Sequence, residues 1–303
     1  MTVRKTFGVF ALLICILLMV PAQAAEQVKP LFTFGVIADI QYADVADSGS
    51  RYYRAAFGKL DDCVKDLNGN KAAFVVQLGD FIDRDFASFN AVLLRYNMLH
   101  TRHYHVLGNH DAACVENESE VFKKLGLEKG YYDFTQGSWR FIVLDGNDLR
   151  LNSSKVTDAA KLAESQAMFQ SLKDRNAPNA QTWNGGAGKE QLLWLKSKLE
   201  AATQANEKVV IFCHFPVLPA AGDNLWNDKE MVRTIEPYKC VKAWINGHNH
   251  AGNYVLKDGI HYLTQQGMLD TPNTTAYSKI EVYPDRLNVI GTGRVQSKTL
   301  TLR

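Results

Sequence analysis

The chain has few cysteines and no pair of them at metal-binding or redox spacing. Five occur in 303 residues, and the absence of a Cys-x-x-Cys pair argues against a zinc ribbon or a thioredoxin-type site. Outside the N-terminal segment the cysteines are Cys63, Cys114, Cys213 and Cys240. We interpret them as buried thiols, although an oxidising compartment could pair them, and the sequence leaves that pairing open.

A strong excess of either charge is also missing. Lysine and arginine number 34 against 32 acidic residues, which gives a formal net charge of +2. A nearly neutral chain offers no case for nucleic acid as a partner. We also find no internal repeat, no low-complexity tract and no clear linker, so the composition favours one ordinary globular domain.

Long apolar runs are missing except at the N-terminus. Arg4 and Lys5 precede an apolar run over residues 8–20, which Pro21 ends before the small-x-small sequence Ala22-Gln23-Ala24. This pattern predicts a signal peptide over residues 1–24, followed by a single catalytic domain over residues 25–303. The alternative is an uncleaved anchor, but the run is short for a bilayer. We therefore expect an exported, periplasmic or secreted protein without a stable membrane anchor.

Strand-like and helix-like segments alternate along the rest of the chain, which favours α/β layering. We expect strands at residues 32–38, 73–78, 103–107, 140–144, 208–213, 243–246, 252–256, 260–265, 276–283 and 286–290. We expect helices at residues 53–66, 88–99, 118–125 and 189–202. Residues 151–184 are predicted to cross the active face, and the polar tail after Gly293 is predicted to end the domain loosely.

Metal-ligand side chains follow five of these predicted strands. In chain order they are Asp39 and Gln41, then Asp80, then Asn109 and His110, then His214, and finally His248 and His250. One such residue after a strand is usually a turn or a helix cap, but five strand ends of this kind are hard to produce by chance. Their oxygen and nitrogen donors suit two divalent metals. No convincing Ser, Cys or Asp nucleophile motif accompanies them, so the set points to metal-assisted hydrolysis of a phosphate ester or anhydride.

These motifs resemble those of the calcineurin-like metallophosphoesterase superfamily. Gly79-Asp80, Gly108-Asn109-His110-Asp111, the lone His214 and Gly247-His248-Asn249-His250 match its blocks outright, whereas the first block has Gln41 where histidine is usual. Glutamine at this place, together with Arg51-Tyr52-Tyr53-Arg54 and Trp183-Asn184-Gly185-Gly186, resembles the branch of manganese-dependent ADP-ribose/CDP-alcohol diphosphatases.

The resemblance implies an α/β sandwich of two mixed sheets flanked by helices, in α-β-β-α layers, with two metals at the strand ends. Asp39, Gln41 and His250 would hold the first metal, and Asn109, His214 and His248 the second, with Asp80 bridging them. A pair of dications roughly 3.5–4 Å apart activates water for in-line attack on phosphorus. Manganese is the expected metal, because an amide oxygen at Gln41 is a harder donor than imidazole; iron, zinc and magnesium are the alternatives.

His110 would lie beside the metals and stabilise the transition state or protonate the departing oxygen. Asp83 is the candidate to orient it, with a helix cap as the equally weighted alternative. Arg84, Tyr53 and Arg54 are candidate substrate contacts, through phosphate binding or base stacking. Ordinary surface charges and a packed helix start explain them as well.

The function that follows is cleavage of the diphosphate bond in nucleoside-diphosphate-linked compounds such as ADP-ribose and CDP-alcohols. The partner would be a small phosphate-containing molecule. A broader phosphomonoesterase or phosphodiesterase with the same metals is the main alternative. A non-catalytic binding module is a third, disfavoured because every expected ligand position carries a competent donor.

Overall fold

Two six-stranded β-sheets form the framework of the protein in the computed structural model, which describes residues 1–3, 29–115, 118–151 and 159–302. The expected signal-peptide core at residues 8–20 and its cleavage site lie outside these residues. In the first sheet the strand order is β12(Lys298–Thr301), β11(Arg286–Gly293), β10(Ala276–Val282), β1(Phe32–Ile37), β2(Phe74–Gln77) and β3(Arg102–His105). In it β1, β2 and β3 are parallel and the remaining pairs are antiparallel.

The second sheet has the same mixed character. Its order is β4(Tyr132–Gln136), β5(Trp139–Val143), β6(Lys208–Phe212), β7(Val241–Asn246), β9(Ile260–Thr264) and β8(Asn253–Lys257). Strands β5, β6, β7 and β9 run parallel, and β4 and β8 pair antiparallel at the two edges. Parallel strands need crossover connections, which the intervening helices provide.

Alternating side chains divide the core into three layers. On β1, Phe34 and Val36 point into a cluster between the sheets, where they meet Phe141 and Phe212 of the second sheet. Ile37, on the other face of β1, packs with the helices that cover the first sheet. Because side chains on a strand alternate between its faces, a strand buried on both sides reads as a continuous apolar run.

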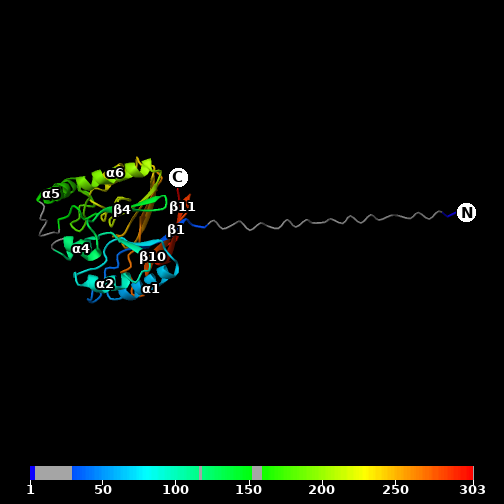
Figure 1. Ribbon diagram of the computed structural model, residues 1–303, viewed down its shortest axis with the longest axis horizontal. Helices are drawn as coiled ribbons and strands as arrows, with labels where there is room; N and C mark the ends of the chain where they lie inside the picture. The colour runs from blue at the N-terminus through cyan, green and yellow to red at the C-terminus, as the bar shows by residue number, and fades with distance from the viewer. Residues whose placement is uncertain (4–28, 116–117, 152–158, 303) are drawn as a thin grey trace.

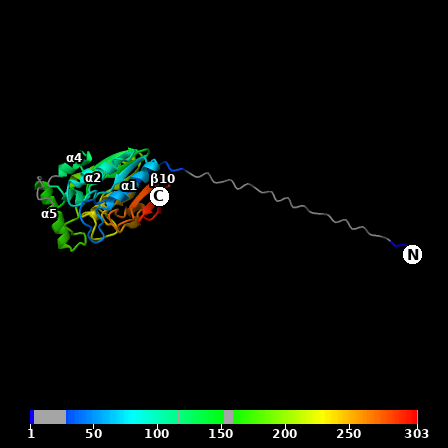
Figure 2. The same cartoon turned by 90° about the horizontal axis from the view of Figure 1, so that it is seen from below.

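Helices cover the outer face of each sheet, so the layers are helix, sheet, sheet, helix (Figure 1). On the first sheet, α1(Ala56–Gly69) and α2(Ser88–Tyr96) lie side by side, and Figure 2 shows them in front. On the second sheet lie α6(Lys189–Gln204) and α7(Asp228–Ile235). The remaining helices are α3(Asn109–Ala113), α4(Glu118–Leu125) and α5(Ala159–Asp174). This confirms the predicted sandwich of two mixed sheets.

Every predicted strand and helix is present, with ends shifted by a few residues. The prediction of a loose tail after Gly293 is wrong, because β12 pairs with β11 and buries Leu300 completely. Strand β4 and helices α3 and α7 were not predicted from the sequence. No helix within the described residues is long and apolar enough to cross a membrane.

The four cysteines outside the N-terminal segment are free thiols. Cys63 and Cys213 are fully buried, and burial raises the pKa of both, to about 12 for Cys213. These two match the expectation of buried thiols, whereas Cys114 and Cys240 are only partly buried and do not.

Candidate metal centre

The predicted ligands lie where parallel strands of both sheets end. Asp39 and Gln41 follow β1, Asp80 follows β2, and Asn109 opens the short helix after β3. On the second sheet His214 follows β6, and His248 and His250 follow β7. The carboxyl ends of parallel strands share one edge of a sheet, and the sandwich places the two edges together, so local motifs far apart in the sequence converge.

The backbone around these residues is strained and closely packed. Asp39, Gln41, Asp80 and His248 are non-glycine residues with φ between 44° and 68°, a left-handed conformation that costs free energy and is concentrated at functional sites. At Gly79, which has φ of 100°, a Cβ atom would come within 2.4 Å of His214 Nδ1. Glycine is therefore required before Asp80, because a side chain there would displace a ligand.

Asp80 lies between two groups of predicted ligands. We call Asp39, Gln41 and His250 the His250 half of the centre, and Asn109, His214 and His248 the His214 half. Asp80 Oδ2 lies 3.3 Å from His214 Nε2 and accepts a hydrogen bond from Gln41 Nε2 at 2.8 Å. Its Oδ1 accepts a hydrogen bond from the His110 backbone N–H at 2.8 Å. A carboxylate with contacts on both oxygens, 1 % exposed, has the position that a bridging ligand needs.

The half that contains His214 is compact. His214 Nε2 lies 3.0 Å from Asn109 Oδ1 and 3.1 Å from His248 Nδ1. Ligand atoms of Asp80, His214 and His248 all lie within 4.8 Å of one another, which is close enough to hold a metal ion. The outward nitrogens are fixed as well, with His214 Nδ1 at 2.9 Å from the Leu78 backbone oxygen and His248 Nε2 at 3.0 Å from Asn184 Oδ1.

The other half brings Asp39, Gln41 and His250 together. His250 Nε2 lies 3.4 Å from Asp39 Oδ1 and 3.3 Å from Gln41 Nε2. Asp39 also accepts hydrogen bonds from the His248 backbone N–H, at 3.2 Å to each of its oxygens. All seven predicted metal-binding side chains therefore form one connected cluster.

The amide of Gln41 is oriented differently from the expectation. Its nitrogen faces Asp80 and His250, while its oxygen, the predicted metal-binding atom, accepts a hydrogen bond from Arg51 Nη1 at 2.9 Å. Arg51 Nη1 also lies 3.2 Å from Asp83 Oδ2. For the Gln41 oxygen to bind a metal, the amide must turn over and release Arg51.

Two supporting residues at the His250 half were missed by the sequence analysis. Asp270 Oδ1 lies 3.2 Å from His250 Nδ1, and Asp270 Oδ2 accepts a hydrogen bond from Arg294 Nη1 at 3.0 Å. Arg294 Nη2 also donates to the His250 backbone oxygen at 3.1 Å. Partners of this kind orient an imidazole ligand and raise its basicity. Neither residue lies in a recognisable motif, and no signal in the sequence identifies them.

His110 and Asp83 are paired beside this cluster. His110 Nδ1 lies 2.9 Å from Asp83 Oδ1, and its Nε2 lies 4.0 Å from Asp80 Oδ2. The first residue of α2 donates its backbone N–H, that of Ser88, to Asp85 Oδ1 at 3.0 Å and not to Asp83. Orientation of His110 therefore describes Asp83 better than the helix-cap alternative does. The His110 ring thus presents one nitrogen to the centre and is held through the other.

Charge within the cluster decides the protonation of its histidines. Burial opposes the charge on His250, but Asp39 and Asp270 outweigh it and raise the pKa of His250 to about 10. Burial likewise opposes the charge on His214, and Asp80 raises its pKa to about 9. Burial and the neighbouring His214 hold the pKa of His248 well below its ordinary value. The carboxylates of Asp39, Asp80 and Asp270 therefore favour positive charge at this site, which a bound cation would supply in place of the imidazole protons.

The three candidate substrate contacts are placed at the edge of the cluster or away from it. Tyr53 is completely buried, so its ring has no open face for a base, and its hydroxyl accepts a hydrogen bond from Arg84 Nη2 at 2.8 Å. Arg54 Nε pairs with Asp44 Oδ1 at 2.6 Å on the surface. The structure supports stacking on Tyr53 least of the three.

The donor set fits two divalent cations. Two buried carboxylates, three imidazoles and two amides converge, and the carboxylates of Asp39 and Asp80 supply negative charge to offset that of the metals. Oxygen-rich donors at the half of Asp39 and Gln41 suit manganese, and the imidazoles suit manganese, iron and zinc alike.

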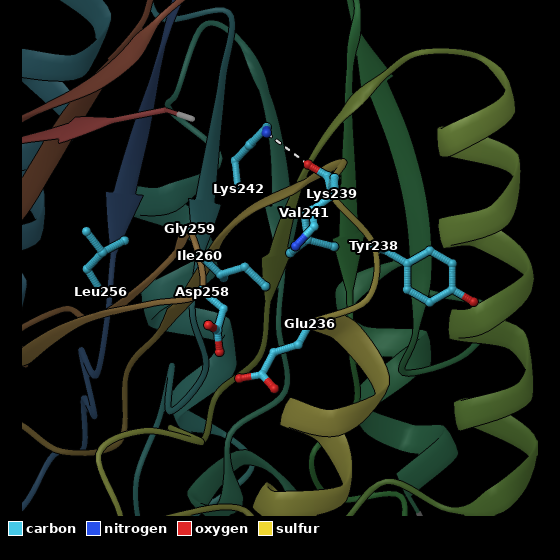
Figure 3. Close-up of a pocket in the computed structure, with 9 residues that line it drawn as sticks. All are labelled: Glu236, Tyr238, Lys239, Val241, Lys242, Leu256, Asp258, Gly259 and Ile260. Carbon is cyan, nitrogen blue, oxygen red and sulfur yellow. Dashed lines mark hydrogen bonds between the residues drawn. The ribbon is translucent and has the colours of Figure 1, made fainter.

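A separate hollow of about 550 Å³ lies at the beginning of β7 (Figure 3). The metal-binding histidines instead follow the end of this strand. Lys239, Lys242, Glu236 and Asp258 line it, and Lys242 Nζ donates to the Lys239 backbone oxygen at 2.8 Å. Its mixed charges and its place at the opposite end of the strand separate it from the metal centre.

A two-sheet sandwich with paired metal positions at its strand ends defines the class of dinuclear metallohydrolases. The family model for calcineurin-like phosphoesterases matches residues 32–252, and the chain belongs to this family. It is accordingly a metal-dependent hydrolase that acts on phosphate ester or anhydride bonds.

Similar proteins agree with this assignment. The chain is 32% identical to a manganese-dependent ADP-ribose/CDP-alcohol diphosphatase of Oryza sativa subsp. japonica, over 89% of this chain and 94% of that protein. It is 30% identical to the mouse protein of the same description, over 94% and 97%. A dimetal phosphatase structure from Danio rerio superimposes with a TM-score of 0.80 at 27% identity, covering 91% of this chain and all of that one.

Proposed function

We propose that this protein hydrolyses the diphosphate bond of nucleoside-diphosphate-linked compounds, such as ADP-ribose and CDP-alcohols. Water adds across the P–O–P linkage, and the products are a nucleoside monophosphate and a phosphorylated alcohol or sugar. The observation that carries the proposal is the first motif, Asp39-Ile40-Gln41, whose two side chains join Asp80 and His250 in one cluster. Relatives of about 30% identity across most of this chain carry that activity in their names.

We assign Asp39, Gln41 and His250 to one metal, Asn109, His214 and His248 to the other, and Asp80 to both. Bound there, two manganese ions supply Lewis-acid activation of water and charge stabilisation. His110 is held by Asp83 through Nδ1 and directs Nε2 towards the centre, so it is placed to stabilise charge on phosphate oxygens or to protonate the departing oxygen. Arg84, whose side chain is half exposed, supplies a positive charge at the rim.

The test compares substrates with the purified, manganese-loaded chain. ADP-ribose and CDP-choline should be hydrolysed with higher kcat/KM than p-nitrophenyl phosphate, and chromatography should detect AMP or CMP together with ribose 5-phosphate or phosphocholine. A preference for the monoester would overturn the diphosphatase assignment in favour of a broad phosphatase. Turnover of none of the three compounds would favour a non-catalytic binding module. Chelation should abolish activity, and added Mn²⁺ should restore it.

We also propose that the protein is exported after removal of residues 1–24. The support is the sequence pattern of a basic start, a short apolar run and Ala22-Gln23-Ala24. Expression in a host with an intact secretory pathway should yield a mature N-terminus at Ala25 by mass spectrometry. Recovery of the chain with its first 24 residues intact, in the membrane fraction, would instead support an anchor.

A further inference from the structure

A small pocket adjoins the metal centre. Its lining includes Asn109, Asn147, Trp183 and Asn184. Two of these residues also belong to the centre, because Asn109 Oδ1 lies 3.0 Å from His214 Nε2 and Asn184 Oδ1 lies 3.0 Å from His248 Nε2. A molecule whose phosphate lies at the metals therefore has this pocket directly beside it.

Trp183 is the exposed aromatic side chain of the pocket. It is 49% exposed, whereas Trp139, Trp226 and Trp244 are fully buried and Trp194 packs against Tyr131. Within the described residues no aromatic ring stacks on Trp183. An indole left open to water is unfavourable by itself, and open apolar surface beside a functional pocket is typical of a ligand site.

The backbone that carries Trp183 is fixed on both sides. The next residue, Asn184, is buried, and its Nδ2 donates to the Gly222 backbone oxygen at 2.7 Å. Two residues further on, Gly186 and Leu149 exchange backbone hydrogen bonds of 2.8 Å in both directions. The indole is thus presented by an anchored turn, so little conformational entropy remains to be lost when a ligand covers it.

We propose that Trp183 is the stacking platform for the nucleobase of the substrate, an inference that rests on the proposed function. An indole face binds flat π-systems by stacking, and each nucleobase has such a face. Stacking makes no demand on the hydrogen-bonding edge of the base. A site of this kind should therefore accept adenine and cytosine conjugates alike, as an enzyme that cleaves both ADP-ribose and CDP-alcohols requires.

The test compares Trp183→Ala and Trp183→Phe with the unchanged protein, each loaded with Mn²⁺. Calorimetry should show that Trp183→Ala binds AMP and CMP roughly five- to hundredfold more weakly, the range expected for loss of one base stack. Ribose 5-phosphate, which lacks a base, should bind all three proteins equally. Trp183→Phe keeps an aromatic face and should retain most of the affinity for AMP.

Leu193→Ala is the matched control, because Leu193 is an exposed apolar side chain on α6, 68% exposed. It should leave AMP binding unchanged. Tryptophan fluorescence gives a second readout that needs no alanine variant: saturating AMP should quench the unchanged protein but not Trp183→Phe.

Two outcomes overturn the inference. One is unchanged affinity of Trp183→Ala for AMP, and the other is equal quenching of the unchanged protein and Trp183→Phe. These results leave the proposed function intact if ADP-ribose and CDP-choline are still hydrolysed by the unchanged protein. Absence of that hydrolysis would overturn the proposed function itself, whatever Trp183 does.

Discussion

The two halves of the metal centre are supported by different kinds of groups. His250 is backed by the carboxylate of Asp270, which is itself paired with Arg294. His214, by contrast, is backed by the backbone oxygen of Leu78, a neutral acceptor just after β2 of the other sheet. One half thus depends on charged side chains from late in the chain, and the other depends on neutral groups, the Leu78 backbone oxygen behind His214 and the Asn184 amide behind His248.

This difference indicates where the site can be tuned. A backbone carbonyl is present whatever the side chain, so the support of His214 survives substitution. The support of His250 is removed by one change at Asp270. Because Asp270 also raises the basicity of the imidazole, we expect the His250 half to respond to mutation more strongly than its neighbour does.

The largest expected effect comes from Asp80→Asn, which removes the charge shared by both halves. Mn²⁺ binding should be lost at both positions, and hydrolysis should fall by well over the ~100-fold that marks the upper range for supporting residues. Calorimetric titration with Mn²⁺ and steady-state assays measure the two effects. Asp44→Asn, at an exposed carboxylate paired with Arg54, is the control and should change neither. Two full equivalents of Mn²⁺ bound by Asp80→Asn would contradict its bridging role.

The second-largest effects are expected from variants that each weaken Mn²⁺ binding in one half of the centre. Asp270→Asn should weaken one of two Mn²⁺ sites by about 10–100-fold, the range seen when a carboxylate behind an imidazole ligand is removed. Asn184→Ala removes only a neutral amide from behind His248 and should weaken the other site by less. Two-site Mn²⁺ titrations of both variants make the comparison. Equal losses, or a larger loss from Asn184→Ala, would show that charged support gives no advantage.

A smaller effect is expected from Gln41→His. An imidazole nitrogen is a softer and stronger donor than the amide, so the first metal should bind more tightly and the preference for Mn²⁺ over Zn²⁺ should narrow. The change should stay below that of Asp270→Asn. Competition titrations with Zn²⁺ and Mn²⁺ measure it, with the unchanged protein as reference. If metal preference and affinity are both untouched, Gln41 is not a ligand and remains the partner of Arg51.

The smallest effect on the centre is expected from His105→Leu, which replaces a buried histidine outside the metal-binding cluster. Burial lowers the pKa of His105 to about 3, and its Nδ1 finds no hydrogen-bond partner in the part of the chain that the structure describes. As the pH falls, His105 is therefore protonated in the unfolded chain near pH 6.5 but in the folded protein only near pH 3. Between these values the free energy of unfolding decreases by roughly 1.4 kcal/mol per pH unit.

His105→Leu should flatten that part of the acid limb while Mn²⁺ affinity at neutral pH stays the same. Denaturant unfolding between pH 4 and 7 measures the slope. An unchanged slope would mean that His105 is accessible to protons in the folded state.

Much of the fold could be predicted because its strands carry their own signal. Strands β1, β2 and β6 are mostly apolar, and residues 34–37, 74–77 and 209–212 in them are buried on both faces. Strand β12 gave no such signal, because Lys298–Thr301 contributes one buried side chain, Leu300, and is held by pairing with β11. Strand β4 lies at a sheet edge with its residues half buried, which weakens the alternation that would identify it.

The metal ligands could be predicted for the same local reason. Asp80, Asn109 and His214 each lie within four residues of the end of a strand, so a few neighbouring residues identify both the motif and its position at the sheet edge. Arg51 belongs to the string Arg51-Tyr52-Tyr53-Arg54 that resembles the diphosphatase branch, but its role could not be recognised in this way. It reaches Gln41 and Asp83 from outside the strand-end motifs, and the string carries no sign of these contacts.

What the sequence determined by itself is the set of donors and their order, because each short motif ends an apolar strand and both features are local. What only the tertiary structure decided is which side chains support those donors. Asp270 and Arg294 reach His250 because β9 lies beside β7 in one sheet and β11 belongs to the facing sheet. Such contacts depend on distances that exist only after the chain has folded, since no periodicity or motif encodes the proximity of separate segments.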